Sequence, residues 1–348
     1  MNHRQELLSL LLFVFTVFGF VSCSDDRWDI DTSEIEVNTE VVLLDKLLFN
    51  SDTNAYSAQI EELLTLYPDF GRAYIELITS RPFQRDTSLV LFTKIHLKDK
   101  YVRDSLVPDI KKRYSEEDIQ LLEQRFTEAF KRFRYFYPKD SIPDIFLANT
   151  AFVFKEPLFS YKNKILVCTE MYMGAGYKYY PFFGFPQYIQ RTMDKHYIVA
   201  DVVKFLYETK YPPGIYGGRE LLGNMIYQGK NLYFQQVMAP FLPDTIIMRY
   251  TKKQLAWAED YEVDIWERFS NKDVLFSTDP EEVGRFLRPG PNTSALDFPT
   301  ESAPRLGEWV GLQIVKSYME RHPEVSLQQL MEMKDYKKIL SEARYKPK

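Results

Sequence analysis

The 348-residue chain contains only two cysteines, Cys23 and Cys168. A fold held together by several disulfides is therefore excluded, and no intramolecular disulfide can form if Cys23 is modified. Cys168 follows the apolar residues Ile165, Leu166 and Val167, where a thiol packs as a small hydrophobic side chain. A nucleophilic cysteine needs a histidine and an electropositive site, and no neighbouring residue supplies them. We therefore predict that Cys168 is buried and unreactive.

Runs of basic residues are also missing. The net charge is -5 and the pI is about 5.6, and lysines and arginines form no continuous stripe, so nucleic acid is not expected as a partner. Hydrophobic residues make up 45% of the chain, which is enough for a sizeable core. Aromatic residues make up 16%, and they predict either an aromatic-rich core or an aromatic-lined groove for a peptide or glycan.

The N-terminus holds an almost unbroken apolar run, from Leu7 to Val21, preceded by His3 and Arg4. This run is shorter than the roughly 20 residues that span a membrane and has the length of the apolar part of a signal peptide. Cys23 follows after one small residue, as in bacterial lipoprotein signals. We therefore predict a signal peptide over residues 1–22 and attachment of lipid, such as palmitate, to the new N-terminal Cys23. An ordinary cleavable signal is the alternative.

Residues 23–40 are acidic and poor in apolar side chains, and we interpret them, with the lipidated cysteine, as a tether. Residues 41–348 contain no internal repeat or low-complexity linker and are expected to form a single domain. The arrangement predicts a cell-envelope protein whose lipid anchor makes the membrane its first partner. The domain would lie in the periplasm or on the cell surface. The sequence does not decide whether the anchor is in the inner or the outer membrane.

Hydrophobic periodicity predicts a mainly α fold with a small β-sheet (α+β). Two short apolar stretches, residues 144–154 and 164–173, are expected to be strands that pair in a small sheet or hairpin. Residues 174–186 are too rich in glycine, proline and aromatics to be helical. The expected helices include residues 56–67, a capped helix from Ser115 that ends before Pro138, residues 186–206, a helix containing residues 224–234, a helix from Thr251, residues 306–320, and a last helix that begins at Ser326.

Histidine is scarce, with four in the chain, and His196 is the one candidate metal ligand. The two expected central helices are the frame in which a zinc peptidase keeps a His-Glu-x-x-His motif and a further glutamate ligand. Tyr197 stands where the general base would be, Ala200 where the second histidine would be, and Gln228 at the position that matches the third ligand. We therefore predict no catalytic residue, no bound metal and no cofactor, with His196 as a structural residue.

Glu220, Asn224, Gln228 and Asn231 form a polar line at helical spacing in the second central helix. With His196, they are our candidates for a cleft or binding surface. The alternative is that the line is the solvated face of the helix. The aromatic loop from Tyr177 to Phe185 leads to a separate hypothesis, a platform that binds glycans, although such a loop can equally be a packed cover over the core.

Several stretches together carry a resemblance to a known family. They are Cys23 with its signal, Met171–Gly174, Tyr188–Arg191, Met225–Tyr233, Ile265–Trp266, Gly290–Pro291, Gly307–Met319 and Tyr345–Pro347. Over almost its whole length, the chain resembles the gliding-motility lipoprotein GldB family of Bacteroidetes.

The resemblance implies a membrane-anchored protein that is required for gliding and works with the motility and type IX secretion machinery of the envelope. The family is distantly similar to predicted zinc-dependent peptidases, which implies a zincin-like helical domain with a degenerate motif here. We therefore expect a non-catalytic component or assembly factor. A zinc-dependent or carboxylate-based envelope hydrolase, and a surface glycan-binding lipoprotein, are the alternatives.

Overall fold

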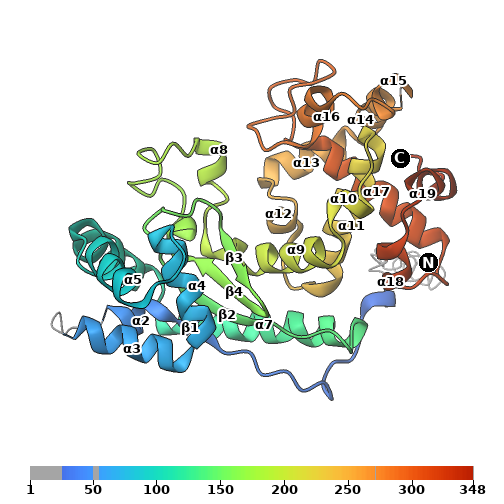
Figure 1. The fold of residues 1–348 in the computed structure, drawn as a ribbon. Coiled ribbons are helices and arrows are strands. Elements are labelled where there is room, and N and C mark those ends of the chain that lie inside the picture. The colour runs from blue at the N-terminus through green and yellow to red at the C-terminus, as the bar shows by residue number, and fades with distance from the viewer. Residues whose placement is uncertain (1–25, 50–54, 271, 348) are drawn as a thin grey trace, which may run out of the picture. The chain divides into compact units, whose positions relative to one another are not determined.

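The computed structural model describes residues 26–49, 55–270 and 272–347 (Figure 1). The predicted signal peptide and the predicted lipidation site, Cys23, lie outside these residues. Packing divides the chain into two units, Met1–Glu34 and Ile35–Lys348. The described part of the first unit contains the short helix η1 (Asp26–Trp28). All other helices and strands given below belong to the second unit, which is mainly α-helical with a small β-sheet, as the sequence predicts.

A four-stranded sheet organises the N-terminal half of the second unit, in the order β1-β2-β4-β3. Strands β1, β2 and β4 are parallel. In their register Val41 lies opposite Ile145, and Ile145 lies opposite Ile165. Both β2 and β4 are buried after their first residue, which is why they consist of unbroken apolar runs. The strands are β1 (Val41–Leu43), β2 (Asp144–Ala148), β3 (Leu158–Tyr161) and β4 (Lys164–Cys168).

The predicted strand pairing was only partly correct. The two expected strands correspond to β2 and β4 and are neighbours, but they run parallel rather than as a hairpin. The hairpin partner of β4 is the edge strand β3, and Lys162 in the left-handed region (φ 52°) closes their tight turn. The sequence prediction missed β1 and β3 because both are very short, three and four residues long.

Helices of the N-terminal half cover the sheet (Figure 1). Phe146 of β2 and Leu166 of β4 belong to one buried cluster with apolar residues of α2 to α5, and the ring centroid of Phe70 lies 4.2 Å from that of Phe146. The predicted cap of the long helix α7 is confirmed, because Ser115 and Asp118 form a capping box. The elements are α2 (Leu44–Leu48), α3 (Tyr56–Leu66), α4 (Pro68–Thr79), α5 (Arg85–Phe92), η2 (Thr93–Leu97), η3 (Val102–Leu106), α6 (Val107–Arg113) and α7 (Glu116–Phe136).

The helix predicted over residues 186–206 is broken into pieces. The structure has α8 (Gln187–Gln190), η5 (Lys195–Tyr197) and α9 (Ile198–Lys210), following the short helix η4 (Thr169–Tyr172) and the aromatic loop. Asp194 causes the break, since its backbone is extended (φ -136°, ψ 145°) and its side chain caps η5 by accepting from the His196 N–H. A single β-bridge to Met173 holds Asp194 in this conformation.

The C-terminal half is helical, and Ser326 caps a helix as predicted. That helix, α18, is not the last one, because α19 follows it. Within the described residues, no helix is long and apolar enough to cross a membrane. The elements are α10 (Pro213–Tyr216), α11 (Leu221–Met238), α12 (Asp244–Ile247), α13 (Lys252–Asp260), α14 (Glu262–Phe269), α15 (Lys272–Leu275), α16 (Pro280–Leu287), α17 (Leu306–Arg321), α18 (Leu327–Glu332) and α19 (Tyr336–Ala343).

Helices α11 and α17 cross at two glycines. A Cβ atom added to Gly229 would collide with the backbone of Gly311, and one added to Gly311 would collide with the backbone oxygen of Met225. Because the colliding atoms belong to the backbone, they cannot move aside as a flexible side chain could. The close approach of the two helices therefore requires glycine at both positions.

Candidate functional site

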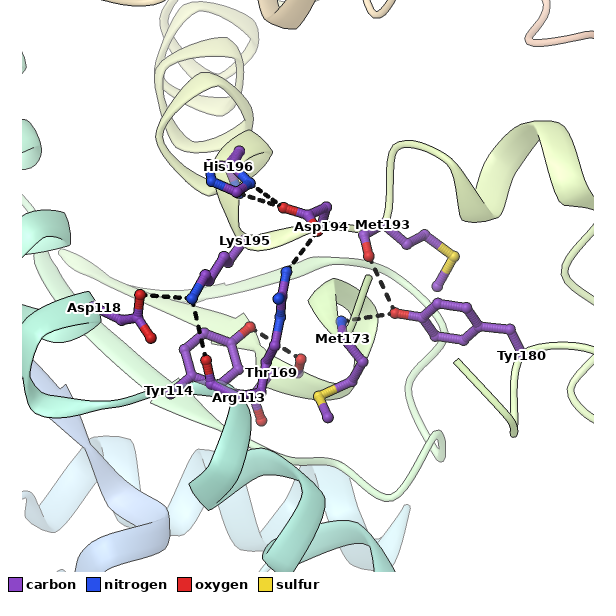
Figure 2. Close-up of polar contacts among 10 residues, drawn as sticks. All are labelled: Arg113, Tyr114, Asp118, Thr169, Met173, Tyr180, Met193, Asp194, Lys195 and His196. Carbon is purple, nitrogen blue, oxygen red and sulfur yellow. Dashed lines mark hydrogen bonds and ion pairs between the residues drawn. The ribbon is translucent and has the colours of Figure 1, made fainter. Parts of the chain in front are cut away.

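His196 lies at the surface, in the turn that leads into α9, with 60% of its side chain exposed (Figure 2). Its Nδ1 atom and its backbone N–H both contact Oδ1 of Asp194, the backbone contact at 3.1 Å. The other oxygen of Asp194 accepts a hydrogen bond of 2.5 Å from Arg113. Burial alone would raise the pKa of Asp194, but the hydrogen bonds from His196 and the charge of Arg113 outweigh it, so that this pKa is lowered. Asp194 is thus a charged anchor for this turn.

Lys195 fixes the same turn to two further helices (Figure 2). Its Nζ donates to Oδ1 of Asp118 at 2.6 Å and to the backbone oxygen of Arg113 at 3.4 Å. Asp118 lies in the first turn of α7, and Arg113 is the last residue of α6. The contacts of residues 194–196 therefore make this turn a junction between α6, α7 and α9, and His196 is part of that junction.

The other positions of a zinc-peptidase motif carry residues with packing contacts. The ring centroid of Tyr197 lies 5.3 Å from the guanidinium carbon of Arg249. Ala200 is 2% exposed, and Gln228 is half-buried on α11. Across residues 26–49, 55–270 and 272–347, no three or more His, Cys, Asp or Glu side chains are grouped so that they could hold a metal ion.

The polar line on α11 is spread over several environments. Glu220, at the start of the helix, accepts from Lys337 and from the Tyr336 hydroxyl, both at 3.1 Å. Asn224 donates to the backbone oxygen of Glu220 at 2.9 Å, so these two predicted binding residues are close together. Asn231, by contrast, is buried, which is not the environment of a solvated helix face.

A second polar cluster is completely buried at the carboxyl ends of the parallel strands. Asp45, Asn149 and Glu170 come just after β1, β2 and β4, and parallel strands bring these ends to one edge of the sheet. Asn149 donates through Nδ2 to Asp45 at 2.8 Å, and its backbone oxygen accepts from the Tyr74 hydroxyl at 2.6 Å. Tyr74 also meets Nε2 of His96 at 3.1 Å. None of the five is more than 1% exposed, so the cluster is closed to an external partner.

Burial controls the ionisation of this cluster. It raises the pKa of Asp45 to about 7, against the opposing effect of the hydrogen bonds from Asn149. Burial also raises the pKa of Glu170, although Thr150 donates to its carboxylate. The pKa of His96 is lowered by burial to about 3, so His96 is neutral at pH 7 and does not balance the carboxyl groups.

An open pocket of about 360 Å³ lies beyond the carboxyl end of β4. We name it the arginine pocket, after Arg191, Arg249 and Arg305 in its wall. Open α/β sheets bind ligands outside the carboxyl ends of their parallel strands, and this pocket has that position. Lys155 and Lys204 add two further basic groups to the lining.

Two of the arginines hold the backbone turn that follows α12 and carries the third, Arg249. Arg191 donates through Nη2 to the backbone oxygen of Arg249 at 2.7 Å, and Arg305 donates through Nη2 to the backbone oxygen of Met248 at 2.5 Å. Arg249 forms an ion pair with Asp201, whose Oδ2 also accepts from the Tyr172 hydroxyl at 2.9 Å.

The lining of this pocket has more basic than acidic side chains, although Arg305 pairs with Glu308 and Lys204 with Glu208, both outside the lining. Of the charged residues that line the pocket, five are basic and only two, Glu156 and Asp201, are acidic. Burial and the neighbouring charge of Arg305 lower the pKa values of Arg191 and Arg249. Like charges held together in a partly desolvated pocket are stabilised when an anion binds between them, and a guanidinium presents a planar fork to carboxylate or phosphate.

The backbone at the pocket is strained. Arg249 has φ 56° and Arg305 has φ 53°, both in the left-handed region that non-glycine residues rarely adopt. Such strain costs roughly 1 kcal/mol or more per residue and is concentrated at functional sites. The two arginines are therefore held in place at an energetic cost.

Sequence reasoning missed the arginine pocket. Its arginines are 58 and 56 residues apart in the chain and form no local pattern. A usable signal was nevertheless present, since three stretches that carry the family resemblance, Met171–Gly174, Tyr188–Arg191 and Gly290–Pro291, all supply residues to this pocket. The predicted binding residues, His196 and the polar line Glu220, Asn224, Gln228 and Asn231, do not line it.

Comparison with known proteins gives one family. No curated protein and no solved structure matches the chain. A family model described as gliding motility protein GldB matches residues 25–347, which is nearly the whole chain. The short name of this family model also marks its members as lipoproteins, which are proteins of the cell envelope. The chain therefore belongs to the GldB family of gliding motility proteins.

Proposed function

We propose that this protein is a lipid-anchored, non-catalytic component of the gliding machinery that works by binding an anionic group in the arginine pocket. The supporting observation is the convergence of Arg191, Arg249 and Arg305 on one open pocket. Asp201 pairs with Arg249 and Glu308 pairs with Arg305, at 3.1 Å for the second pair. Within the described residues Arg191 forms no ion pair with a carboxylate and donates instead to the backbone oxygen of Arg249, so its charge is available to a ligand.

The other two arginines would add to the binding free energy that an anion gains from Arg191. The side chains of Arg249 and Arg305 are only 22% and 10% exposed, so water screens their charges weakly. A hydrogen bond to a charged group contributes about 1.5–3 kcal/mol under such conditions. Loss of one arginine is therefore expected to weaken anion binding by roughly tenfold to a hundredfold.

The non-catalytic part of the proposal rests on Tyr197 and Ala200. The tyrosine ring lies against Arg249 and the alanine is in the core, so each position serves packing. As a lipoprotein of this family, the protein would act as a component or assembly factor of the motility and type IX secretion machinery, with other envelope proteins of that machinery as partners.

The test uses gliding cells whose own copy carries Arg191→Gln. Glutamine removes the charge but keeps a donor, and Arg191 is only half-buried, so the fold is expected to survive. We expect colony spreading and secretion of type IX cargo to fall severalfold at unchanged protein level. The matched control is Arg103→Gln, because Arg103 is exposed, pairs with Asp104 and lies outside the pocket. Normal spreading by the Arg191 variant would overturn the proposal.

A further inference from the structure

Phe182 is 82% exposed, more than any other large hydrophobic side chain of the described residues. It lies in the loop before α8, which projects away from the sheet and from α7 (Figure 1). The loop is fixed at its base, because the buried Tyr180 hydroxyl accepts from the Met173 N–H at 2.8 Å and donates to the Met193 oxygen at 3.3 Å (Figure 2). Phe182 is thus presented to solvent on an anchored loop.

A series of aromatic contacts joins Phe182 to the arginine pocket. Its ring centroid lies 5.1 Å from that of Phe183, which stacks on Phe152 at 4.1 Å. Phe152 in turn lies 6.2 Å from Phe185, and Phe185 lines the pocket. Val153, next to Phe152, is 49% exposed. These ring contacts therefore connect the exposed tip of the loop to the wall of the pocket through the buried Phe152.

The pocket side of the loop carries basic side chains. Lys155 lines the pocket together with the half-buried Arg191, and Lys204, which also lines it, forms an ion pair of 3.7 Å with Glu208. On the other side of the loop, Lys178 forms an ion pair of 2.8 Å with Asp109, so its charge is balanced. An apolar tip thus stands beside a basic pocket that also has apolar walls, among them Ile189.

A membrane surface fits both features at once. Aromatic rings are favoured at the level of the lipid headgroups, and anionic headgroups attract basic residues. A lipid also places its phosphate directly beside its acyl chains, as the basic and apolar walls of the pocket require. A peptide carboxylate could use the arginines, but it would leave the exposed Phe182 without a role.

We propose that the arginine pocket binds the phosphate group of an anionic membrane lipid while Phe182 enters the membrane interface, an assignment that rests on the proposed function of the pocket. The lipid anchor would bring the domain to the membrane, and this second contact would orient it there with the loop before α8 facing the bilayer.

Site-directed spin labelling tests the orientation in the full lipidated protein. Phe182→Cys is labelled with a nitroxide, while Cys168 is fully buried and does not react. The control is Val90→Cys on α5, which is 71% exposed and equally apolar. In vesicles that contain anionic phospholipid, we expect the label at position 182 to become more accessible to oxygen than to a water-soluble nickel chelate. The label at position 90 stays in water. An aqueous label at position 182 would overturn the orientation.

Calorimetric titration of the protein with soluble ligands tests the chemistry of the pocket. We expect dihexanoyl phosphatidylglycerol to bind, and Arg191→Gln to weaken it roughly tenfold or more, while Arg103→Gln leaves it unchanged. Equal binding of inorganic phosphate would identify a site for the free anion. Preferred binding of a peptide through its terminal carboxylate would identify a peptide site. Either result would overturn the lipid assignment.

The two proposals can fail separately. If Arg191→Gln abolishes gliding but the label at position 182 stays aqueous and the short-chain lipid does not bind, the pocket keeps its function and the lipid assignment is wrong. If the lipid binds but Arg191→Gln cells glide normally, the lipid site exists and the proposed function is wrong.

Discussion

Replacing Asp45 with asparagine separates the charge of a buried acid from its hydrogen bonds. Asp45 is 1% exposed, and its Oδ1 accepts from the side-chain and backbone nitrogens of Asn149 at 2.8 and 3.3 Å. Within the described residues, its Oδ2 has no hydrogen-bond partner. Asparagine has nearly the same shape and can keep the accepting oxygen towards Asn149, so the main change is the loss of a group that can ionise.

The pKa of Asp45 gives the expected magnitude. Burial raises the pKa to about 7 from the ordinary 3.8, so the folded protein binds this proton more tightly than the unfolded chain does. The resulting stability is fully present below about pH 4 and is lost as the pH rises to about 7. At about 1.4 kcal/mol for each pH unit, ionisation of Asp45 costs the folded wild-type protein about 4 kcal/mol by pH 8. The asparagine variant does not incur this cost.

The assay is urea unfolding of both proteins, followed by circular dichroism at pH 4.5, 6 and 8. His96 contributes in the opposite direction, because its pKa is lowered to about 3 and its stabilisation grows as the pH rises to about 6.5. His96 is present in both proteins, so its contribution cancels in their difference. The measured quantity is the unfolding free energy of Asp45→Asn minus that of the wild type. We expect this difference to increase by about 3–4 kcal/mol from pH 4.5 to pH 8.

A difference that stays constant over this pH range would refute the reasoning. It would mean that Asp45 keeps an ordinary pKa despite its burial, for example because another cation reaches it. A difference that falls with pH would show that the ionised form of Asp45 is the stabilising one.

Three further predictions follow from other parts of the structure. Gly311→Ala should lower the unfolding free energy by about 2 kcal/mol or more, because the added methyl group meets the backbone of Met225; unchanged urea stability would contradict the packing of α11 on α17. His196→Ala should leave gliding normal, since His196 serves a structural junction, and a loss of gliding together with loss of bound metal would contradict this role. Cys23→Ala should release the protein from membranes on fractionation, and continued membrane attachment would refute the lipid anchor.

Local signals in the sequence predicted much of the fold. The capping boxes at Ser115, Thr251 and Ser326 are present in the structure, and Cys168 is buried at the end of β4 as expected. These features depend on residues within one turn or one strand of each other. The break at Asp194 was missed because the extended backbone there depends on a bridge to Met173, which is distant in sequence.

The candidate site could not be read from the sequence in the same way. The arginine pocket depends on Arg191, Arg249 and Arg305, which come from three separate loops and are brought together by the tertiary fold. Helical spacing, which can be seen directly in a sequence, points instead to the zinc-peptidase frame with His196 and α11. Residues on separate loops can come together in the fold at any separation along the chain, so no sequence pattern reveals them.

The gliding speed of single cells across a charge series at position 191 tests the central claim most directly. Cells carry Arg, Lys, Gln or Glu at this position, with equal amounts of protein in the envelope. If the pocket works by binding an anionic group, speed should fall in the order Arg, Lys, Gln, Glu, because lysine keeps the charge without the planar fork and glutamate repels the ligand. Cells with Arg191→Glu that glide as fast as wild type would contradict the account.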